Sequence, residues 1–211
     1  MIPLILRLKK ENHKEIARAQ DIMIKALYEL FNNAVLHGGT SIWRCYKGNR
    51  FSEDIDVYLK NDKSKINSLF ELFQKRGLVL ERKKISNQSI YSTLKFNRTL
   101  VRFEAIFKKE EGMLKDYESS DGTFITVYTL SPEELIKEKV ATYLKRFKIR
   151  DLYDIFFLLR YVEDIAIIRQ NLNELLDKFK KPLDEKDLRV IILEGLVPDT
   201  EKMLDYIKGK L

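Results

Sequence analysis

The sequence has few of the residues that form disulfides or zinc sites. Its 211 residues include a single cysteine, Cys45, and two histidines, His13 and His37. One cysteine excludes an intramolecular disulfide, and so few histidines and cysteines exclude a zinc site made from those ligands. A metal site in this chain must therefore be built from oxygen ligands.

Long apolar runs are also missing. No stretch approaches the roughly 18 apolar residues that a membrane-spanning helix needs. The opening residues, MIPLILRLKK, lack the order of regions and the cleavage site of a secretory signal. We therefore expect a cytoplasmic protein that has no membrane contact, and we expect it to be a monomer.

Charge is abundant and unbalanced. The chain has 39 basic and 32 acidic residues, which gives a formal net charge of +7. This balance is compatible with a polyanionic partner such as RNA, because neutralised phosphates release counterions. It is equally compatible with a surface on which charges are spread as ion pairs, as in thermophile proteins. Both interpretations stay open at this point.

Hydrophobic spacing divides the chain near residue 130. Before that point we expect the helices 12–31, 40–47 and 63–76 and the strands 34–37, 52–60, 78–86, 89–97, 99–107 and 123–130. Ser131, Pro132 and Glu134 then form a capping box, and everything after them has helical spacing. The expected helices there span 132–147, 150–161, 164–180, 185–195 and 199–209. The sequence thus predicts an α/β (α+β) domain over 1–130, with a mixed sheet flanked by helices, and a C-terminal helical bundle over 131–211.

Two aspartates lie on the expected strand 52–60. Because successive side chains on a strand point to opposite faces, Asp54 and Asp56 share one face while Ile55 and Val57 share the other. Two carboxylates held this closely repel each other unless a cation lies between them. Hard oxygen ligands favour magnesium, with manganese as an alternative.

A glycine turn precedes these aspartates. Gly38 and Gly39 allow the backbone to turn tightly and to approach a ligand closely. Thr40 and Ser41 then open a short helix, whose exposed N–H groups and two hydroxyls suit phosphate oxygens. The order of turn and carboxylates indicates a nucleoside triphosphate with a divalent metal.

A third carboxylate is available on the strand 99–107. Its apolar residues alternate, which places Arg102 and Glu104 on the other face, beside the aspartates if the two strands are neighbours. Glu104 is therefore the candidate that completes the metal site and helps to activate a hydroxyl. The alternative is that Arg102 and Glu104 simply face solvent.

The motifs resemble those of a known family. A Gly-Gly turn before an Asp-x-Asp pair resembles the polymerase-beta-like nucleotidyltransferases. The longer pattern is similar to the AbiEii/AbiGii nucleotidyltransferase toxins of type IV toxin–antitoxin and abortive-infection systems. It consists of Gly-Gly-Thr, Arg-x-Ser-x-Asp-Ile-Asp, Glu-Lys-x-x-Ala and Arg-Asp-x-x-Asp, and it covers roughly residues 30–160.

The resemblance implies further roles. It implies magnesium-dependent transfer of a nucleoside monophosphate from a nucleoside triphosphate to an acceptor hydroxyl of RNA, tRNA or protein, and a cognate antitoxin. By resemblance, Arg50, Ser52, Lys139, Arg150 and Asp151 are candidates for nucleotide binding. Asp154 is, in the same way, a candidate for catalysis at the acceptor hydroxyl.

The charged residues of the helical half have a purely structural role as an alternative to nucleotide binding and catalysis. Residues three or four apart share a helical face, so Asp151 and Asp154 are neighbours. Arg150 and Asp151 could therefore join two helices by ion pairs.

We expect the active site to lie between the two domains. The rival functions are a nucleotide-binding regulator without turnover and a small-molecule nucleotidyltransferase, against which the basic charge argues.

Overall fold

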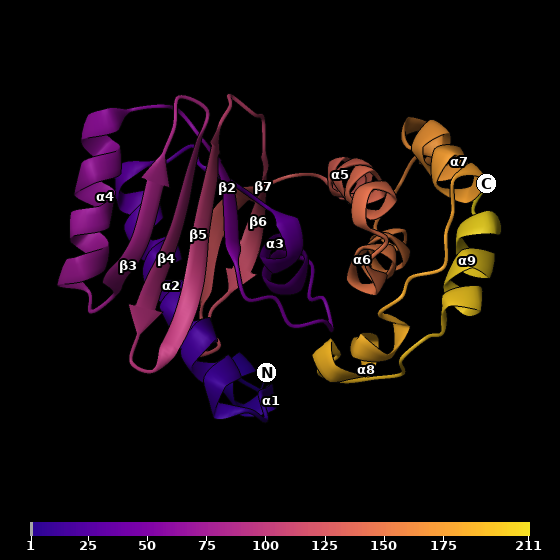
Figure 1. Cartoon of the computed structure of the whole chain (residues 1–211), viewed down its shortest axis with the longest axis horizontal. Coiled ribbons are helices and arrows are strands. Elements are labelled where there is room, and N and C mark those ends of the chain that lie inside the picture. The colour runs from indigo at the N-terminus through magenta and orange to yellow at the C-terminus, as the bar shows by residue number, and fades with distance from the viewer. Residues whose placement is uncertain (1) are drawn as a thin grey trace. The chain divides into compact units, whose positions relative to one another are not determined.

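The computed structural model describes residues 2–211, and it separates into two compact units. The first comprises the described residues up to Lys47 together with Phe51–Thr129, and the second comprises Gly48–Arg50 and Leu130–Leu211. Figure 1 shows a sheet with its helices in the first unit and helices in the second. The short segment 48–50 belongs to the second unit, although it lies in sequence between two elements of the first.

The first unit is built on one mixed sheet. Within the described residues this sheet has seven strands in the order β3-β4-β5-β2-β1-β7-β6. The strands are β1 (Val35–His37), β2 (Ile55–Leu59), β3 (Val79–Ile85), β4 (Ser89–Phe96), β5 (Thr99–Phe107), β6 (Met113–Glu118) and β7 (Phe124–Thr129). β2 runs parallel to β5, and β1 runs parallel to β7. The two strands that carry the predicted carboxylates are therefore direct neighbours.

Helices cover one face of this sheet. They are α2 (Glu11–Leu30), α3 (Gly38–Cys45) and α4 (Lys63–Lys75), and the short α1 (Leu4–Arg7) precedes α2. Phe103 of β5 packs edge-on against Phe70 and Phe73 of α4, with ring centroids 6.4 and 5.4 Å apart. In Figure 1, β3, β4 and β5 lie in front of α2. Apolar alternation on β2 and β5 therefore faces the helices, as the sequence predicts.

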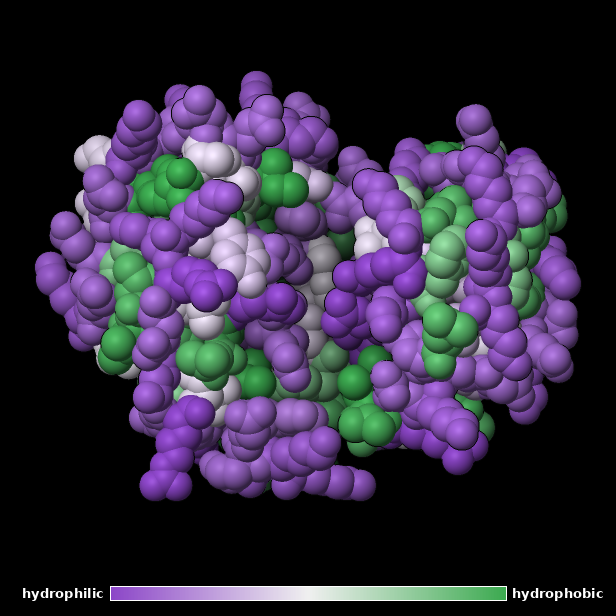
Figure 2. All heavy atoms as spheres, in the orientation of Figure 1, coloured by the Kyte–Doolittle hydropathy of each residue, from purple (hydrophilic) through white to green (hydrophobic). Residues whose placement is uncertain are grey.

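The opposite face of β3, β4 and β5 is open. Along it, the side chains of Tyr91, Leu100 and Ile106 are 37%, 58% and 45% exposed. In Figure 2 hydrophilic residues predominate on the visible face of this unit, and hydrophobic residues appear only in small separate areas. The polar members of each strand pair therefore remain accessible.

The second unit is helical. Its helices are α5 (Pro132–Arg146), α6 (Ile149–Leu158), α7 (Arg169–Asp177), α8 (Leu188–Ile191) and α9 (Thr200–Lys208), with 3-10 turns η1 (Ile165–Ile167) and η2 (Glu185–Asp187). The predicted capping box at the start of α5 is present, because Ser131 and Glu134 exchange hydrogen bonds with each other's backbone N–H groups. None of the helices in residues 2–211 has the length and apolar character needed to cross a bilayer.

Two elements escaped prediction, and two predicted helices are shorter than expected. β6 was missed because it is an edge strand in which charged residues interrupt the apolar alternation, and α1 is too short to show a period. The predicted helix 164–180 is a 3-10 turn followed by α7. The predicted helix 185–195 ends at Ile191, because Ile192 leaves the helix to form a β-bridge with Arg50.

Candidate active site

A row of polar side chains crosses the open face of the sheet. His37 is the register partner of Asp56, and Asp56 is the partner of Glu104. Glu104 in turn opposes Tyr91, which opposes Lys84 on the edge strand. Directly opposed residues share a face and lie about 5 Å apart. The structure thus brings Asp56 and Glu104 together as predicted.

Glu104 has an environment that favours its protonated form. Burial raises its pKa, and the neighbouring Asp56 carboxylate raises it further, while Arg102 opposes both effects. A carboxyl group with a raised pKa accepts a proton more readily near neutral pH than an ordinary one. Glu104 is therefore the member of the row best suited to take a proton from a hydroxyl.

Asp54 is bound by Arg102 rather than turned fully toward the other two carboxylates. The guanidinium donates from Nε to Asp54 Oδ1 over 2.7 Å and from Nη2 to Oδ2, which forms a bidentate pair. The hydrogen bond to Asp54 is also the main reason why the pKa of Arg102 is raised. Sequence reasoning placed Arg102 on this face but gave it no role. The sequence feature that could have indicated a role for Arg102 is its position two residues before Glu104, on the same face of the strand.

The fit of this site to a divalent cation is partial. Asp54, Asp56 and Glu104 supply the hard oxygen ligands that Mg²⁺ takes. Among residues 2–211, however, no group of three His, Cys, Asp or Glu side chains is arranged to hold a metal ion. Both oxygens of Asp54 accept hydrogen bonds from Arg102. The three carboxylates are ligands of the right chemical type for a divalent cation. To bind one, Asp54 must either share its oxygens between the cation and Arg102 or release Arg102.

Gly38 adjoins Asp56. Its φ is +72°, and a Cβ at this position would lie 2.3 Å from Asp56 Oδ2. Only glycine meets both conditions without strain. α3 begins at Gly38, two residues earlier than predicted, and no side chain caps its N-terminus. The first N–H groups of α3 therefore start beside a carboxylate of the row.

The hydroxyls of the predicted phosphate turn have partners inside the protein. Thr40 and Ser41 are fully buried; Thr40 donates to the carbonyl oxygen of Asp54, and Ser41 shares a hydrogen bond with Thr129. Ser52 is also buried, and its carbonyl oxygen accepts a hydrogen bond from Gln20 over 2.9 Å. These side chains hold the turn in place. The groups left to meet a phosphate are the backbone N–H groups of Gly39, Thr40 and Ser41.

A second cluster of charges lies within the second unit. Asp154, 1% exposed, accepts hydrogen bonds from Arg50 Nε (2.8 Å) and Nη2 (2.7 Å), and its Oδ2 lies 2.8 Å from Lys139 Nζ. Burial disfavours its ionised form, but Arg50 and Lys139 outweigh burial and lower its pKa. A carboxylate with a lowered pKa and three cationic donors is a poor general base. Its geometry is that of a group that holds two cations.

Asp151 completes this cluster. It is fully buried and accepts two hydrogen bonds from Arg146, of 2.7 and 2.9 Å, while Lys139 Nζ lies 3.5 Å from its Oδ1. The structural alternative drawn from the sequence had Arg150 and Asp151 join the two helices by ion pairs, and Asp151 of α6 does pair with residues of α5. The partner is Arg146, because the last turn of α5 reaches the first turn of α6. Arg150 forms no ion pair within the described part of the chain.

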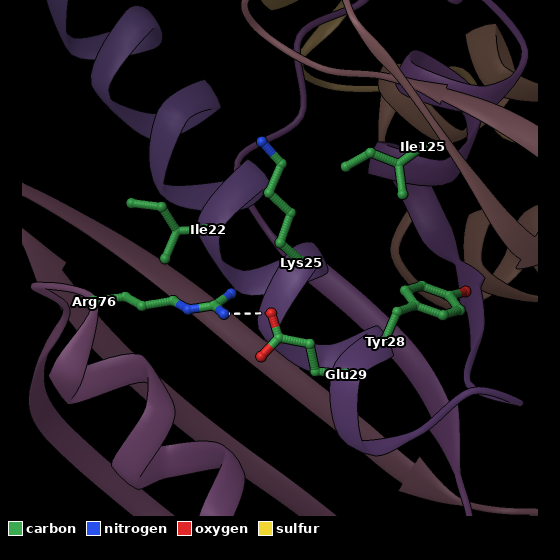
Figure 3. Close-up of a pocket in the computed structure, with 6 residues that line it drawn as sticks. All are labelled: Ile22, Lys25, Tyr28, Glu29, Arg76 and Ile125. Carbon is green, nitrogen blue, oxygen red and sulfur yellow. Dashed lines mark hydrogen bonds and ion pairs between the residues drawn. The ribbon is translucent and has the colours of Figure 1, made fainter.

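One sizeable pocket lies elsewhere on the first unit. It has a volume of about 750 Å³ and is lined by Ile22, Lys25, Tyr28, Glu29, Arg76 and Ile125. Figure 3 shows that four of these residues project from α2 and that Arg76 and Glu29 pair with each other. α2 packs against the face of the sheet opposite the carboxylates. None of the predicted site residues lines this pocket.

Several solved structures share this fold. One is the nucleotidyltransferase toxin MenT4 from Mycobacterium tuberculosis H37Rv, with a TM-score of 0.68 and 18% identity over 98% of this chain and 85% of that one. Another is JHP933 from Helicobacter pylori, with a TM-score of 0.69 and 18% identity over 95% of this chain and 90% of that one. At this identity the likeness establishes the fold. No curated protein matches the sequence.

The family is established by the sequence model that it matches. Residues 22–207 match the model described as nucleotidyl transferase AbiEii toxin, type IV TA system. The chain therefore belongs to the AbiEii family of nucleotidyltransferase toxins, and it is an enzyme of nucleotidyl transfer. The resemblance seen in the sequence is confirmed, and membership implies a nucleoside triphosphate substrate and a cognate antitoxin.

Proposed function

We propose that this enzyme transfers a nucleoside monophosphate from a nucleoside triphosphate to an acceptor hydroxyl, with Mg²⁺ or Mn²⁺ held by Asp54, Asp56 and Glu104. The observation that carries the proposal is the pairing of Asp56 with Glu104 directly beside the glycine turn at Gly38. A cation there would neutralise phosphate charge and position the attacking and leaving oxygens.

The residues of the row have distinct parts in the reaction. The acceptor oxygen attacks the α-phosphorus, the bond from that phosphorus to the bridging oxygen breaks, and pyrophosphate leaves. The proton of the acceptor hydroxyl passes to an oxygen of Glu104, which lies beside Asp56 on the open face of the sheet. Asp54 and Asp56 would hold the metal that neutralises the phosphate charge.

The start of α3 is the proposed place for the phosphates. Its first turn contains no acidic residue, and its N-terminus has no side-chain cap. The N–H groups there are unpaired within the helix and carry partial positive charge. Gly38 begins the helix, and Gly39, Thr40 and Ser41 bind phosphate through their backbone N–H groups. The buried hydroxyls of Thr40 and Ser41, and the hydrogen bond from Gln20 to the carbonyl oxygen of Ser52, fix the backbone in position.

In the second unit, Lys139 and Arg50 are the proposed phosphate-binding cations, and Arg150 is a further one. Asp151 and Asp154 hold Lys139, and Asp154 also holds Arg50, because each aspartate is buried and bound by cationic side chains. The catalytic role inferred for Asp154 from resemblance stays a prediction. Its lowered pKa favours orientation of Arg50 and Lys139 over proton abstraction.

RNA, including tRNA, is the proposed acceptor in preference to protein. Arg82, Lys84 and Lys95 lie on the open sheet face beyond Glu104, by their register with Thr93, Tyr91 and Val79. None of the three forms an ion pair with a described residue, whereas lysines on α2, directly after α7 and on α9 pair with nearby acids. Unpaired cations beside an exposed tyrosine suit a phosphate backbone and stacked bases. This distribution favours a polyanionic partner over dispersed surface ion pairs.

The transfer is tested with labelled nucleotides. Each of the four nucleoside triphosphates is supplied with label on either the α- or the γ-phosphate, with total RNA and a protein fraction as acceptors. We expect the α-label to enter the acceptor and the γ-label to leave as pyrophosphate, and EDTA to stop both. Incorporation of the γ-label would contradict nucleotidyl transfer.

The acceptor is tested by removing the open-face cations. The variant Arg82→Gln/Lys84→Gln/Lys95→Gln should transfer less label to RNA, and the slope of log affinity against log salt should become shallower by about 2. The matched control is Lys14→Gln/Lys178→Gln/Lys202→Gln, which removes three lysines that already pair with acids. Equal RNA affinity in the two variants, or label that enters only protein, would contradict the RNA proposal.

A further inference from the structure

Arg102 is a cation placed within the carboxylate site. It lies on β5, on the same face as Glu104, and binds both oxygens of Asp54 through Nε and Nη2. The same Nε lies 3.9 Å from Glu104 Oε1. Its side chain is 41% exposed and that of Asp54 is 21% exposed, so the pair lies at the accessible edge of the site. The guanidinium thus contacts two of the three carboxylates that would receive a metal.

The charges explain how the carboxylates remain together without a metal. Asp54, Asp56 and Glu104 carry three negative charges when ionised, and the permanently charged guanidinium reduces the sum to two. Each carboxylate oxygen has two lone pairs, and Arg102 uses one on each oxygen of Asp54. Asp54 can therefore still accept a cation, but that cation must bind with a fixed positive charge beside it.

We propose that Arg102 is a positioning residue that takes the place of the metal in the nucleotide-free enzyme and makes metal binding depend on the triphosphate. The inference rests on the proposed metal-dependent function. A bare divalent cation is repelled by the guanidinium, whereas a cation that arrives on a triphosphate brings compensating negative charge. The metal therefore enters with the nucleotide, and the free enzyme holds it weakly.

The test measures Mn²⁺ binding to the full chain without nucleotide, by the loss of the free Mn²⁺ signal in electron paramagnetic resonance. Arg102→Gln removes the competing charge, and we expect it to bind Mn²⁺ at least about tenfold more tightly than the wild type. The control is Arg98→Gln, the same change of charge in the exposed turn between β4 and β5. Its affinity should stay within about twofold of the wild type.

A second variant and a second measurement guard against misfolding. Arg102→Lys keeps the charge but cannot reproduce the planar fork. It should bind Mn²⁺ with an affinity between those of the wild type and Arg102→Gln. The melting temperature is recorded for each variant with and without Mn²⁺. The rise on adding Mn²⁺ should be largest for Arg102→Gln, because that variant has the least compensated carboxylates.

The outcomes separate this inference from the function on which it rests. If wild type binds Mn²⁺ and both Arg102 variants bind it equally or more weakly, the role of Arg102 is contradicted while the metal site stands. If wild type and variants bind no Mn²⁺ either alone or with a triphosphate, the proposed metal site fails and the inference fails with it. A merely structural Arg102 would lower the melting temperature without tightening metal binding.

Discussion

Gly38 lies where the neighbouring Asp56 leaves no room for a side chain. Its positive φ disfavours any Cβ, and the nearby Asp56 oxygen leaves no room for one. Gly77 has a similar φ of +87°, but nothing lies within 4 Å of the position its Cβ would take. Substitutions at the two glycines therefore distinguish the free-energy cost of backbone strain from the cost of a clash with Asp56.

We predict that Gly38→Ala costs more than Gly77→Ala. Gly77→Ala should lose about 1 kcal/mol of stability from the left-handed backbone alone. Gly38→Ala should lose more and should also reduce nucleotidyl transfer, because Asp56 has to move. Unfolding by urea and the transfer rate per folded molecule are measured for both. Equal losses of stability with normal transfer in Gly38→Ala would show that the turn has no part in the site.

We predict that Glu104 lowers the stability of the folded protein at neutral pH while it supports nucleotidyl transfer. A folded-state pKa raised above the ordinary value of a glutamate means that the folded protein binds this proton more tightly than the unfolded chain does. The stability contributed by the protonated group is thus present at low pH and is lost as the pH rises through the folded-state pKa. Glu104→Gln should therefore melt slightly higher than wild type at pH 7 and not at pH 4, while transfer falls. A lower melting temperature at pH 7 would contradict the assigned environment.

At the scale of elements, the cluster of α5 and α6 is the clearest stabilising contact of the second unit. It joins Lys139 and Arg146 of α5 to Asp151 and Asp154 of α6, and Asp154 also holds Arg50 of the segment 48–50. Removing one partner of a buried ion pair leaves the others uncompensated. The cluster therefore ties three stretches of sequence together.

Asp154→Asn is predicted to cost about 3 kcal/mol of stability at pH 7. Since Arg50 and Lys139 lower the pKa of Asp154 below 3.8, its stabilising charge is present above that value and is lost as the pH falls through the folded-state pKa. The difference between variant and wild type should thus shrink in acid. Stability and transfer are measured on the same samples. A large loss of transfer with unchanged stability would instead place Asp154 in the chemistry.

The elements show what sequence patterns can and cannot predict. Alternation on β2 and β5 correctly placed Asp54, Asp56, Arg102 and Glu104 on one face, because side-chain direction in a strand depends only on local spacing. The Arg102 fork and the partner of Asp151 were not predictable in this way. Each depends on which of several nearby charges reaches the carboxylate, and in the case of Arg102 and Asp54 the two residues are 48 positions apart in sequence.

The same limit applies to the phosphate turn. The sequence correctly predicts a tight turn and a helix after it, but it assigned the hydroxyls of Thr40 and Ser41 to phosphate. Both hydroxyls have partners within the protein, the Asp54 carbonyl oxygen and Thr129. Thr129 is 88 residues from Ser41, so no local pattern could have revealed this pairing.

At the scale of the whole molecule, the chain passes between its two units three times. It leaves the first unit after Lys47, returns at Phe51 and leaves again after Thr129. The segment 48–50 lies between the phosphate turn and the carboxylate strand, and its Arg50 belongs to the helical unit. A boundary drawn from composition alone misses such a segment, because three residues have no compositional signature.

We propose that Asp54, Asp56 and Glu104 support metal-dependent nucleotidyl transfer. The most direct test compares transfer of α-labelled nucleotide to total RNA by wild type and Asp56→Asn. We expect the variant to lose at least about a hundredfold of the transfer rate, with a melting temperature that is unchanged or higher because a carboxylate repulsion is removed. The control Asp205→Asn, on the exposed face of α9, should transfer normally. Full transfer by correctly folded Asp56→Asn would show that these carboxylates do not support the reaction.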